Sequence, residues 1–457
     1  MPFVTRWIKS VFAALWLLSA PAQAQQIELT LDQARQVAVA ALQDGQPAVT
    51  LEIAQALLQA DPRDAEMHFL IARAYQAQAN PDAGRQAAAA AFRMASDPLL
   101  KFRAAQLAAR LAVEGEKPVL AQIWLRRAAN HVPNDQEQAL LARDFATLRL
   151  ISPWSLRGAL ATAPSNNVNN GASNPENTID GVSSVGVLSS DALALSGIKA
   201  SGYAEAAYRL DRTEVSETRA VVRLDLSRVW LSADALAASP TSDNGDFAYT
   251  AVDVGVSHRR QLGNGRDVLS LAGGAAHAWY AGADYRDSTR FSASLSRPLD
   301  EGAALTATLS GLNSRPVGSA AITTTAAQLA YSQPTDAGPI TIGAQVQNHA
   351  TVNDNARLQK ALVYGGFTPD LADDRYSLAL NAGFALSHYP DYRVGFIAVP
   401  GGRLDQTTFV TADLNFNTLD YWGFVPNLKL SAQKSLSNVS RFETEELSLA
   451  FGVVSRF

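Results

Sequence analysis

The feature that most constrains the fold is the alternation of side chains in the last stretch of the chain, Glu446–Phe457. Successive side chains of a β-strand point to opposite faces, so alternate residues of this stretch form two distinct surfaces. The odd-numbered positions, mostly large and apolar, are Leu447, Leu449, Phe451, Val453, Ser455 and Phe457. The positions between them are small, polar or charged, apart from Val454. A membrane-barrel strand needs such a pair of surfaces, one facing lipid and one facing a wet lumen.

The same alternation recurs throughout residues 151–457, where helix-forming runs give way to Ser, Thr, Gly and Asn. The alternative is a soluble sandwich with a terminal edge strand, but a single soluble domain of roughly 300 residues would be unusually large. An even number of about fourteen strands is typical of bacterial barrels. Strands are predicted near 155–164, 193–210, 217–233, 247–260, 267–282, 285–298, 302–314, 320–333, 338–350, 357–368, 375–389, 403–417, 423–437 and 445–457.

The connections between the predicted strands fall into two classes. The long, Gly-, Ser- and Asn-rich segments 165–192, 234–246 and 388–402 would all lie at one end of the barrel, and the short turns at the other. With both chain ends in the periplasm, the long loops would face the cell exterior. We expect any lumen of about fourteen strands to be narrow or partly plugged.

The first 24 residues are typical of an export signal. Arg6 and Lys9 precede the apolar run Val11–Leu18, and Ala22-Gln23-Ala24 provides a small-x-small cleavage site. We therefore expect a signal peptide at 1–24 and a mature protein that folds outside the cytoplasm. No later run is long and apolar enough for a spanning helix.

Residues 25–150 are rich in helix formers and are interrupted at regular intervals. Pro62, Pro98 and Pro133 recur at close to the tetratricopeptide period. The segments Leu70–Tyr75 and Leu107–Leu111 occupy equivalent positions one repeat apart. Either a tetratricopeptide-like stack or a generic helical solenoid would provide a concave surface for an extended peptide or a partner protein. Aromatic and Arg side chains dominate such interfaces, so the candidate client-binding residues are Tyr75, Arg110 and Trp124, although Tyr75 and Trp124 occupy repeat positions that usually pack helix against helix.

The composition excludes several classes of function. The 457-residue chain carries 38 basic and 43 acidic residues, which argues against a nucleic-acid partner. It contains no cysteine, so disulfides and thiol chemistry are excluded. The six histidines have no metal-ligand spacing, and no catalytic constellation emerges. We expect no enzyme activity, no cofactor and no metal.

Local motifs lie at both ends of the predicted barrel. Their residues are Pro153, Trp154, Pro164, Asn166 and Asn169 near the first strand, and Gly423, Pro426, Ser437 and Asn438 in the closing hairpin. These motifs resemble those of the surface lipoprotein assembly modulator family. The predicted order of signal peptide, tetratricopeptide-like domain and barrel is also that of this family. The closing Ser-Arg-Phe differs from the family's usual ending, which leaves the client open. The terminal strand, with Phe451, Val453 and Phe457, resembles the signal read by the barrel assembly machinery.

The predicted fold is therefore an α+β multidomain chain. It comprises a periplasmic all-α tetratricopeptide-like solenoid at 25–150 and a roughly 14-stranded antiparallel transmembrane β-barrel at 151–457, in the outer membrane of a Gram-negative bacterium. The resemblance implies an outer-membrane protein translocator that captures a periplasmic client, a surface lipoprotein or secreted soluble protein, and delivers it to the cell surface. The alternative is a passive porin or a polysaccharide export channel with a helical accessory domain. The expected partners are outer-membrane lipid, the barrel assembly machinery and the client.

Overall fold

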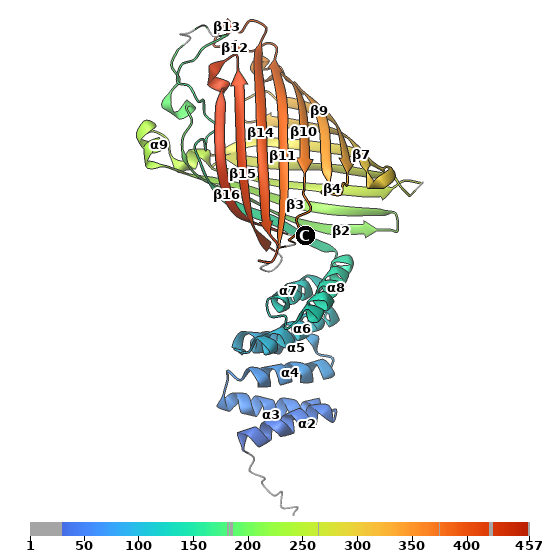
Figure 1. Cartoon of the computed structure of the whole chain (residues 1–457). Coiled ribbons are helices and arrows are strands. Elements are labelled where there is room, and N and C mark those ends of the chain that lie inside the picture. Colours follow the sequence, from blue (N-terminus) through green and yellow to red (C-terminus); the bar gives the residue numbers. More distant parts are fainter. Residues whose placement is uncertain are drawn as a thin grey trace, which may run out of the picture. The chain divides into compact units, whose positions relative to one another are not determined.

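The computed structural model describes residues 30–180, 182, 186–263, 265–373, 375–419 and 424–455. Helices come first along the chain and a closed β-barrel follows (Figure 1). Two compact units divide between Gln138 and Ala139, so most of the last long helix belongs to the barrel unit. The predicted signal peptide, Gly423 and Phe457 lie outside the described residues.

The first part of the chain forms helices whose starts are fixed by capping residues. Thr30 and Gln33 form a reciprocal capping box, and Asp64 and Asp97 accept hydrogen bonds from the first-turn amides of their helices. Proline occupies the first turn of four helices, where its missing N–H costs no hydrogen bond. The helices are α2 (Leu31–Gln43), α3 (Pro47–Ala60), α4 (Ala65–Ala77), α5 (Pro81–Met94), α6 (Pro98–Glu114), α7 (Pro118–Ala129) and α8 (Asp135–Ile151).

Helices α2 to α7 stack as a solenoid, because each packs against the next along the chain and α4 also contacts α2 and α6. Alanines and leucines form the interior, including Ala72 and Leu111. Gly84 in α5 lets two helices approach closely, since a Cβ there would lie 3.1 Å from both the Ala72 carbonyl oxygen and Leu111 Cδ1. The predicted helical solenoid is confirmed.

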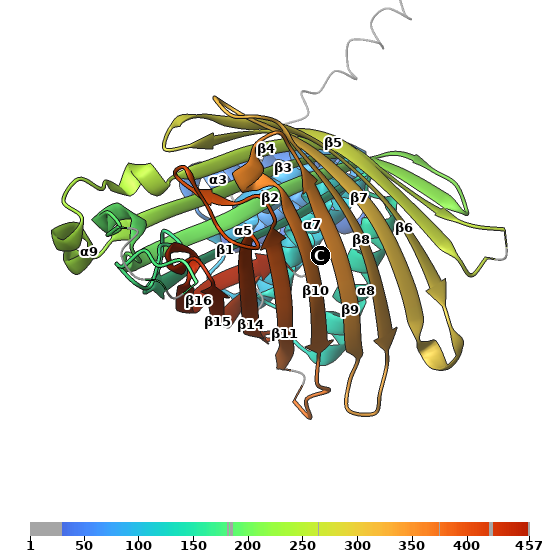
Figure 2. The same cartoon turned by 90° about the horizontal axis from the view of Figure 1, so that it is seen from above.

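Fourteen strands close into a single antiparallel barrel, which Figure 2 shows from above. The predicted strand number and order are confirmed. A two-stranded hairpin, β12 (Arg393–Val394) with β13 (Ile397–Ala398), lies within one connection. The barrel strands are β1 (Trp154–Ser165), β2 (Gly197–Arg212), β3 (Ser216–Leu231), β4 (Tyr249–Gln261), β5 (Val268–Tyr280), β6 (Ala283–Pro298), β7 (Ala304–Pro316), β8 (Ile322–Gln333), β9 (Ile340–Ala350), β10 (Leu358–Phe367), β11 (Tyr376–Tyr389), β14 (Arg403–Phe416), β15 (Phe424–Ser437) and β16 (Thr444–Ser455).

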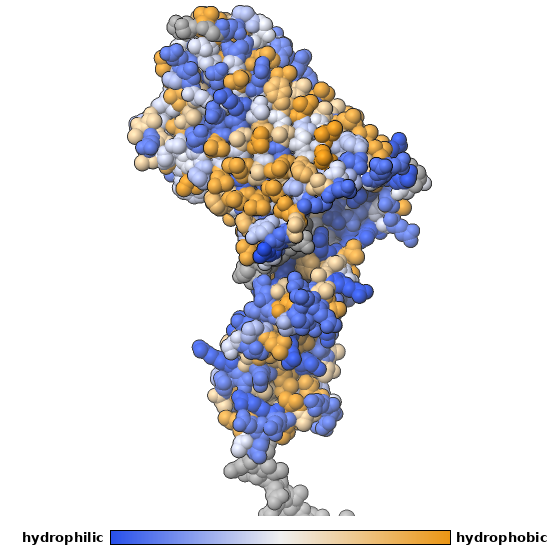
Figure 3. All heavy atoms as spheres, viewed as in Figure 1, coloured by the Kyte–Doolittle hydropathy of each residue, from blue (hydrophilic) through white to orange (hydrophobic). Residues whose placement is uncertain are grey.

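The strand register fixes which residues face out and which face in. In β16, Leu447, Leu449, Phe451 and Val453 share the outer face, whereas Ser448 faces its inward partner Ser431 on β15. Apolar side chains gather on the outer face formed by β11 and β14 to β16, with polar side chains among them (Figure 3). This is the predicted separation of a lipid-compatible exterior from a polar interior. Within the part of the chain that the structure describes, no helix is both long and apolar enough to cross a membrane.

The two ends of the barrel differ as the sequence predicted. We call the end where β1 begins the proximal end, and the opposite end the distal end. The long connections 166–196, 232–248 and 390–402 all lie at the distal end, and short turns such as 299–303 and 334–339 lie at the proximal end. The connection 232–248 contains a short helix, α9 (Ala233–Ala238).

Candidate functional site

A ladder of alternating charges crosses the inner wall of β1, β2 and β3. Arg157 on β1 binds Glu205 on β2, and Arg223 on β3 lies 3.9 Å from the other oxygen of the same carboxylate. Arg223 also pairs with Asp225 at 2.8 Å and stacks over the Tyr203 ring, 4.1 Å from its centroid. Each carboxylate therefore has a guanidinium partner on the wall, and these side chains are held in fixed positions rather than free to move in the lumen.

The charged wall continues across β5 through one long side chain. Arg290 on β6 forms a two-point ion pair with Asp253 on β4, with its Nε 2.8 Å from Oδ2. Gly274 on β5 and Gly255 on β4 leave the space for this reach, because a Cβ at either position would lie within 3.5 Å of Arg290 Nη2. The pairing joins strands that are not neighbours, which explains why it cannot be read from either strand alone.

The remaining inward positions are mostly small or polar. Ala272, Ala276 and Ser292 line β5 and β6, and Ser431, Ser448 and Thr411 line β14 to β16. Small side chains leave lumen volume free, and hydroxyl groups keep its wall wet. Basic residues outnumber acidic ones: Arg157, Lys199, Arg209, Arg219, Arg223, Arg259, Arg286, Arg290, Lys360, Arg403 and Lys429 against Glu205, Glu217, Asp225, Asp253, Asp405, Asp413 and Glu446.

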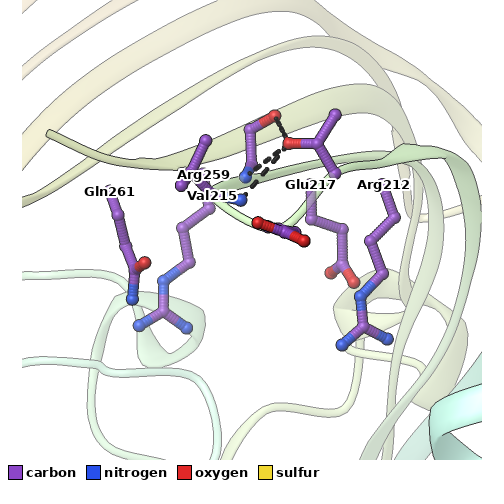
Figure 4. Close-up of a pocket in the computed structure, with 8 residues that line it drawn as sticks. Arg212, Val215, Glu217, Arg259 and Gln261 are labelled. Atoms are coloured by element: carbon purple, nitrogen blue, oxygen red, sulfur yellow. Dashed lines mark hydrogen bonds between the residues drawn. The ribbon is translucent and has the colours of Figure 1, made fainter. Parts of the chain in front are cut away.

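The proximal rim of the barrel carries a polar pocket of about 650 Å³ at the β2–β3 turn. Figure 4 shows Arg212 and Glu217 on one side and Arg259 and Gln261 on the other, all extending in the same direction from the rim. Arg212 donates a hydrogen bond to the Leu150 carbonyl, at the end of α8. The rim therefore offers charged side chains of both signs to whatever enters from this end.

Three connections pack together at the distal end and form what we call the loop cap: 166–196, 390–402 and 438–443. Ile179, Tyr392, Val399 and Val439 make its apolar centre. Backbone hydrogen bonds cross between the connections: Ser173 N–H donates to the Glu443 carbonyl, Asp180 N–H to that of Asn438, and Ser440 N–H to that of Thr178. The cap is thus one cooperative unit built from segments far apart in the sequence.

Arg403 connects the loop cap to the barrel wall. It is 6% exposed and lies between the rings of Tyr389 and Phe442, at 3.5 and 3.6 Å from their centroids. Its guanidinium pairs with Asp405 at 3.1 Å, and Asp405 also accepts a hydrogen bond from Ser437. Inward residues near this end, including Ser387, are likewise buried, so the cap covers the distal part of the wall.

The predicted asparagine motifs hold the loop cap in place. Asn166 Oδ1 accepts a hydrogen bond from Leu447 N–H, joining the end of β1 to β16. Asn169 bonds the backbones of Asp191, Leu193 and Leu195. Asn438 bonds Leu404 N–H, the Gly402 carbonyl and Asp180, and so links all three connections.

The other motif residues lie on the barrel wall or at its edges. The Pro153 carbonyl accepts a hydrogen bond from Arg209 N–H, which fixes the start of β1. Trp154 faces outward at the proximal end with its ring edge-on to Tyr208, 4.8 Å between centroids. Pro164 and Pro426 lie on the outer face of β1 and β15.

The three candidate client-binding residues of the helical domain differ in exposure. Trp124 is buried, packs edge-to-face on Phe92, and is covered by the Arg127 guanidinium 4.4 Å from its ring. It therefore packs helix against helix, and its expected place on a client surface is corrected. Tyr75 is half-buried against the apolar cluster of α2 to α4, and Arg110 on α6 is exposed. Arg110 remains the most accessible of the three.

Sequence reasoning missed the most highly organised side chains of the barrel. Arg403, Arg290 and Asp253 carry no sequence motif, and their only signal is a charge at an inward position of an alternating strand. His277 is one of the six histidines without metal-ligand spacing, yet its two ring nitrogens contact Asp287 at 2.7 Å and Asp284 at 3.1 Å on the outer face. Among the described residues, no three His, Asp or Glu side chains converge as metal ligands.

Comparison with known proteins finds likeness to solved structures only. No protein-family model matches the chain, and no curated protein matches it. The type III secretion translocator chaperone SycD of Yersinia enterocolitica is 18% identical over 27% of this chain and 88% of its own, with a TM-score of 0.25. The COG4313 outer membrane channel of Pseudomonas putida F1 is 14% identical over 65% of this chain and 94% of its own, with a TM-score of 0.35. A bacterial polysaccharide outer membrane secretin is 11% identical over 66% of this chain and 98% of its own, with a TM-score of 0.33. By its own architecture, the chain joins a tetratricopeptide-like helical domain to a 14-stranded barrel of the outer-membrane type.

Proposed function

We propose that this protein is an outer-membrane translocator. Its helical domain, in the periplasm, captures a client protein, and its barrel provides the route to the cell surface. The client is a surface lipoprotein or a secreted soluble protein, as the resemblance to the surface lipoprotein assembly modulator family implies. Insertion depends on the barrel assembly machinery and on outer-membrane lipid.

The observation that carries this proposal is the joining of two features in one chain: a barrel with a wet, charge-lined wall and a stack of helix pairs. Helix-repeat stacks present extended surfaces for polypeptides. Linking such a surface to a pore raises the local concentration of a bound client at the mouth without any new contact. Passive diffusion of small solutes would need no such surface.

The charged wall suits a polypeptide better than a single-sign polymer. The wall offers both signs to a chain that carries both, because its charges neutralise one another in three pairs: Arg157 with Glu205, Arg223 with Asp225, and Arg290 with Asp253. The proximal rim repeats this mixture with Arg212, Glu217 and Arg259.

A polysaccharide export channel is the second candidate. Basic residues outnumber acidic ones on the inner wall, and Lys199, Arg259 and Lys360 form no salt bridge with a described residue. Unpaired basic side chains would favour an anionic polymer.

Removal of the helical stack tests the translocator proposal. Residues 31–134 are deleted while α8 is kept, because Arg209 on β2 bonds the carbonyls of Leu150 and Ile151 at the end of α8. The surface proteome is then compared among cells with the intact chain, the deletion variant and no copy. We expect the deletion variant to insert as a heat-modifiable barrel while its client accumulates in the periplasm.

Undiminished client display with the deletion variant would contradict a capture role. If no surface protein depends on the intact chain, translocation itself is refuted. Loss of surface carbohydrate in the same cells would support the second candidate instead.

A further inference from the structure

The seam between β1 and β16 is interrupted within the described residues. Backbone pairing runs from Ala159↔Val454 to Thr162↔Phe451, then skips two residues before resuming at Ser165↔Ser448. The other strand pairs run continuously where they are described, apart from irregularities at Arg209/Asp211 and Ala278/Trp279. The seam that closes the barrel is therefore its most weakly paired one near the distal end.

The sequence explains the interruption. Pro164 lies within the skipped segment and has no N–H to donate to a ladder. Beyond the skipped residues, side chains bridge the two strands: Ser165 Oγ donates to Glu446 Oε1 at 3.0 Å, and Asn166 Oδ1 accepts from Leu447 N–H at 3.1 Å. One backbone pair, Ser165↔Ser448, and two side-chain bonds therefore hold this part of the seam in place of a continuous ladder.

An apolar hollow opens on the outer face at the same place. Its volume is about 530 Å³, and Pro164, Ile198, Trp230 and Leu447 line its lipid-facing side. Ser165 and Asn166, the residues that bridge the seam, line it as well. The weak part of the seam thus connects the polar inner wall to an apolar site on the exterior.

We propose that the β1–β16 seam is a lateral exit, and that the hollow beside it receives the acyl chains of a lipid-anchored client. This inference rests on the proposed translocator function and specifies its client as a lipoprotein. The client's polypeptide follows the polar lumen, and its acyl chains pass between β1 and β16 into the outer leaflet.

Energetics require such a route. Every acyl CH₂ group left in water adds to the free energy, so the acyl chains of a lipid anchor cannot be released at a water-facing distal end without a large cost. The charge ladder of Arg157, Glu205 and Arg223 offers them no apolar surface inside the barrel. An opening in the wall next to Ile198 and Trp230 lets the chains leave without crossing water at the surface.

A disulfide bond engineered across the seam tests the exit directly, because it can be reduced again. The chain contains no cysteine of its own that could form other disulfides. The pair Ser165→Cys and Ser448→Cys replaces two facing residues across the seam, and Ser310→Cys with Ala326→Cys provides a matched control between β7 and β8. The readout is surface exposure of a lipoprotein whose display is lost in cells without this chain. We expect the oxidised seam lock to reduce display at least about tenfold, reductant to restore it, and the control lock to change nothing.

Equal display with the seam lock and the control lock would overturn the lateral exit while leaving translocation intact. The seam would then serve only to close the barrel during assembly. If no lipoprotein loses display when the chain is absent, the proposed function fails and the lateral exit fails with it.

A second measurement needs no client. A benzophenone side chain replaces Trp230 or, as a control on the outer face of β14, Val410, which is similarly exposed. Both variants are irradiated in proteoliposomes that contain a triacylated cysteine lipopeptide. We expect severalfold more lipopeptide capture at position 230 than at 410, and equal capture would refute the hollow as an acyl-chain site.

Discussion

Replacing Arg403 with methionine should release the loop cap from the barrel wall. Methionine has a similar length and keeps packing against Tyr389 and Phe442, but it removes the charge. Asp405, which is 8% exposed, would lose its guanidinium partner and keep only the hydrogen bond from Ser437. The change therefore isolates the ion pair from the loss of side-chain volume.

The free-energy cost of Arg403→Met follows from the burial of the Arg403–Asp405 ion pair. Removing one partner of a buried ion pair costs about 3–5 kcal/mol, because the other charge stays buried without compensation. The remaining Ser437 hydroxyl bond places the expected cost near the lower end, about 3 kcal/mol. A difference of about 1.4 kcal/mol is tenfold in an equilibrium constant, so the open cap should become roughly a hundredfold more populated.

Hydrogen exchange of the backbone amides that cross between the loops measures this population. Ser173, Asp180 and Ser440 donate such bonds, and their exchange should accelerate by roughly that factor while β7 and β8 stay protected. The double variant Arg403→Met with Asp405→Leu removes both charges and should recover most of the protection. Unchanged exchange in the single variant, or no recovery in the double variant, would refute the account of Arg403 as the anchor of the cap.

Three further predictions concern the exterior, the helical core and the pH dependence. Leu309→Arg places a charge on the lipid face of β7 and should destabilise the folded barrel in the membrane by about 2–4 kcal/mol. The neighbouring inward substitution Ser310→Arg should insert normally. The fraction of folded barrel in both variants is measured by heat-modifiable migration. Leu111→Ala should cost about 2–5 kcal/mol of helical-domain stability, measured by urea titration of the helical circular dichroism, because Leu111 is buried in the solenoid. The hydrogen bond and charge of Lys117 lower the pKa of Asp82 below its ordinary value of 3.8. This contribution to stability is therefore complete above pH 3.8 and is lost as the pH falls through the lower folded-state pKa. In urea titrations at decreasing pH, the free energy of unfolding should therefore fall more steeply for the wild type than for Lys117→Met.

The helix and strand assignments were predictable because their signals are local. The period-two pattern of β16 states which residues face lipid, and the Pro residues at 47, 81, 98 and 118 mark helix starts within single segments. Side-chain direction in a strand depends only on position along it, so the two faces of each strand follow from sequence alone. The two-ended arrangement of loops follows from the antiparallel order for the same reason.

Whether a side chain serves the core or a surface was not predictable at the repeat positions of the solenoid. Trp124 is buried against Phe92 and Arg110 is exposed, although both belong to residue types favoured at interfaces. The repeat pattern specifies that a position faces a neighbouring helix, but the stacking of particular helices decides how much of the side chain stays accessible.

The sequence by itself determined the classes of element, their order, the strand number and the lipid-facing residues. Only the tertiary structure decided which residues meet inside the barrel. Arg290 reaches Asp253 over two glycines, Arg403 joins Asp405 beneath a cap of three distant connections, and the seam weakens where Pro164 meets β16. Each of these contacts depends on the register between strands and on closure of the barrel, which are properties of chain segments brought together rather than of any one segment.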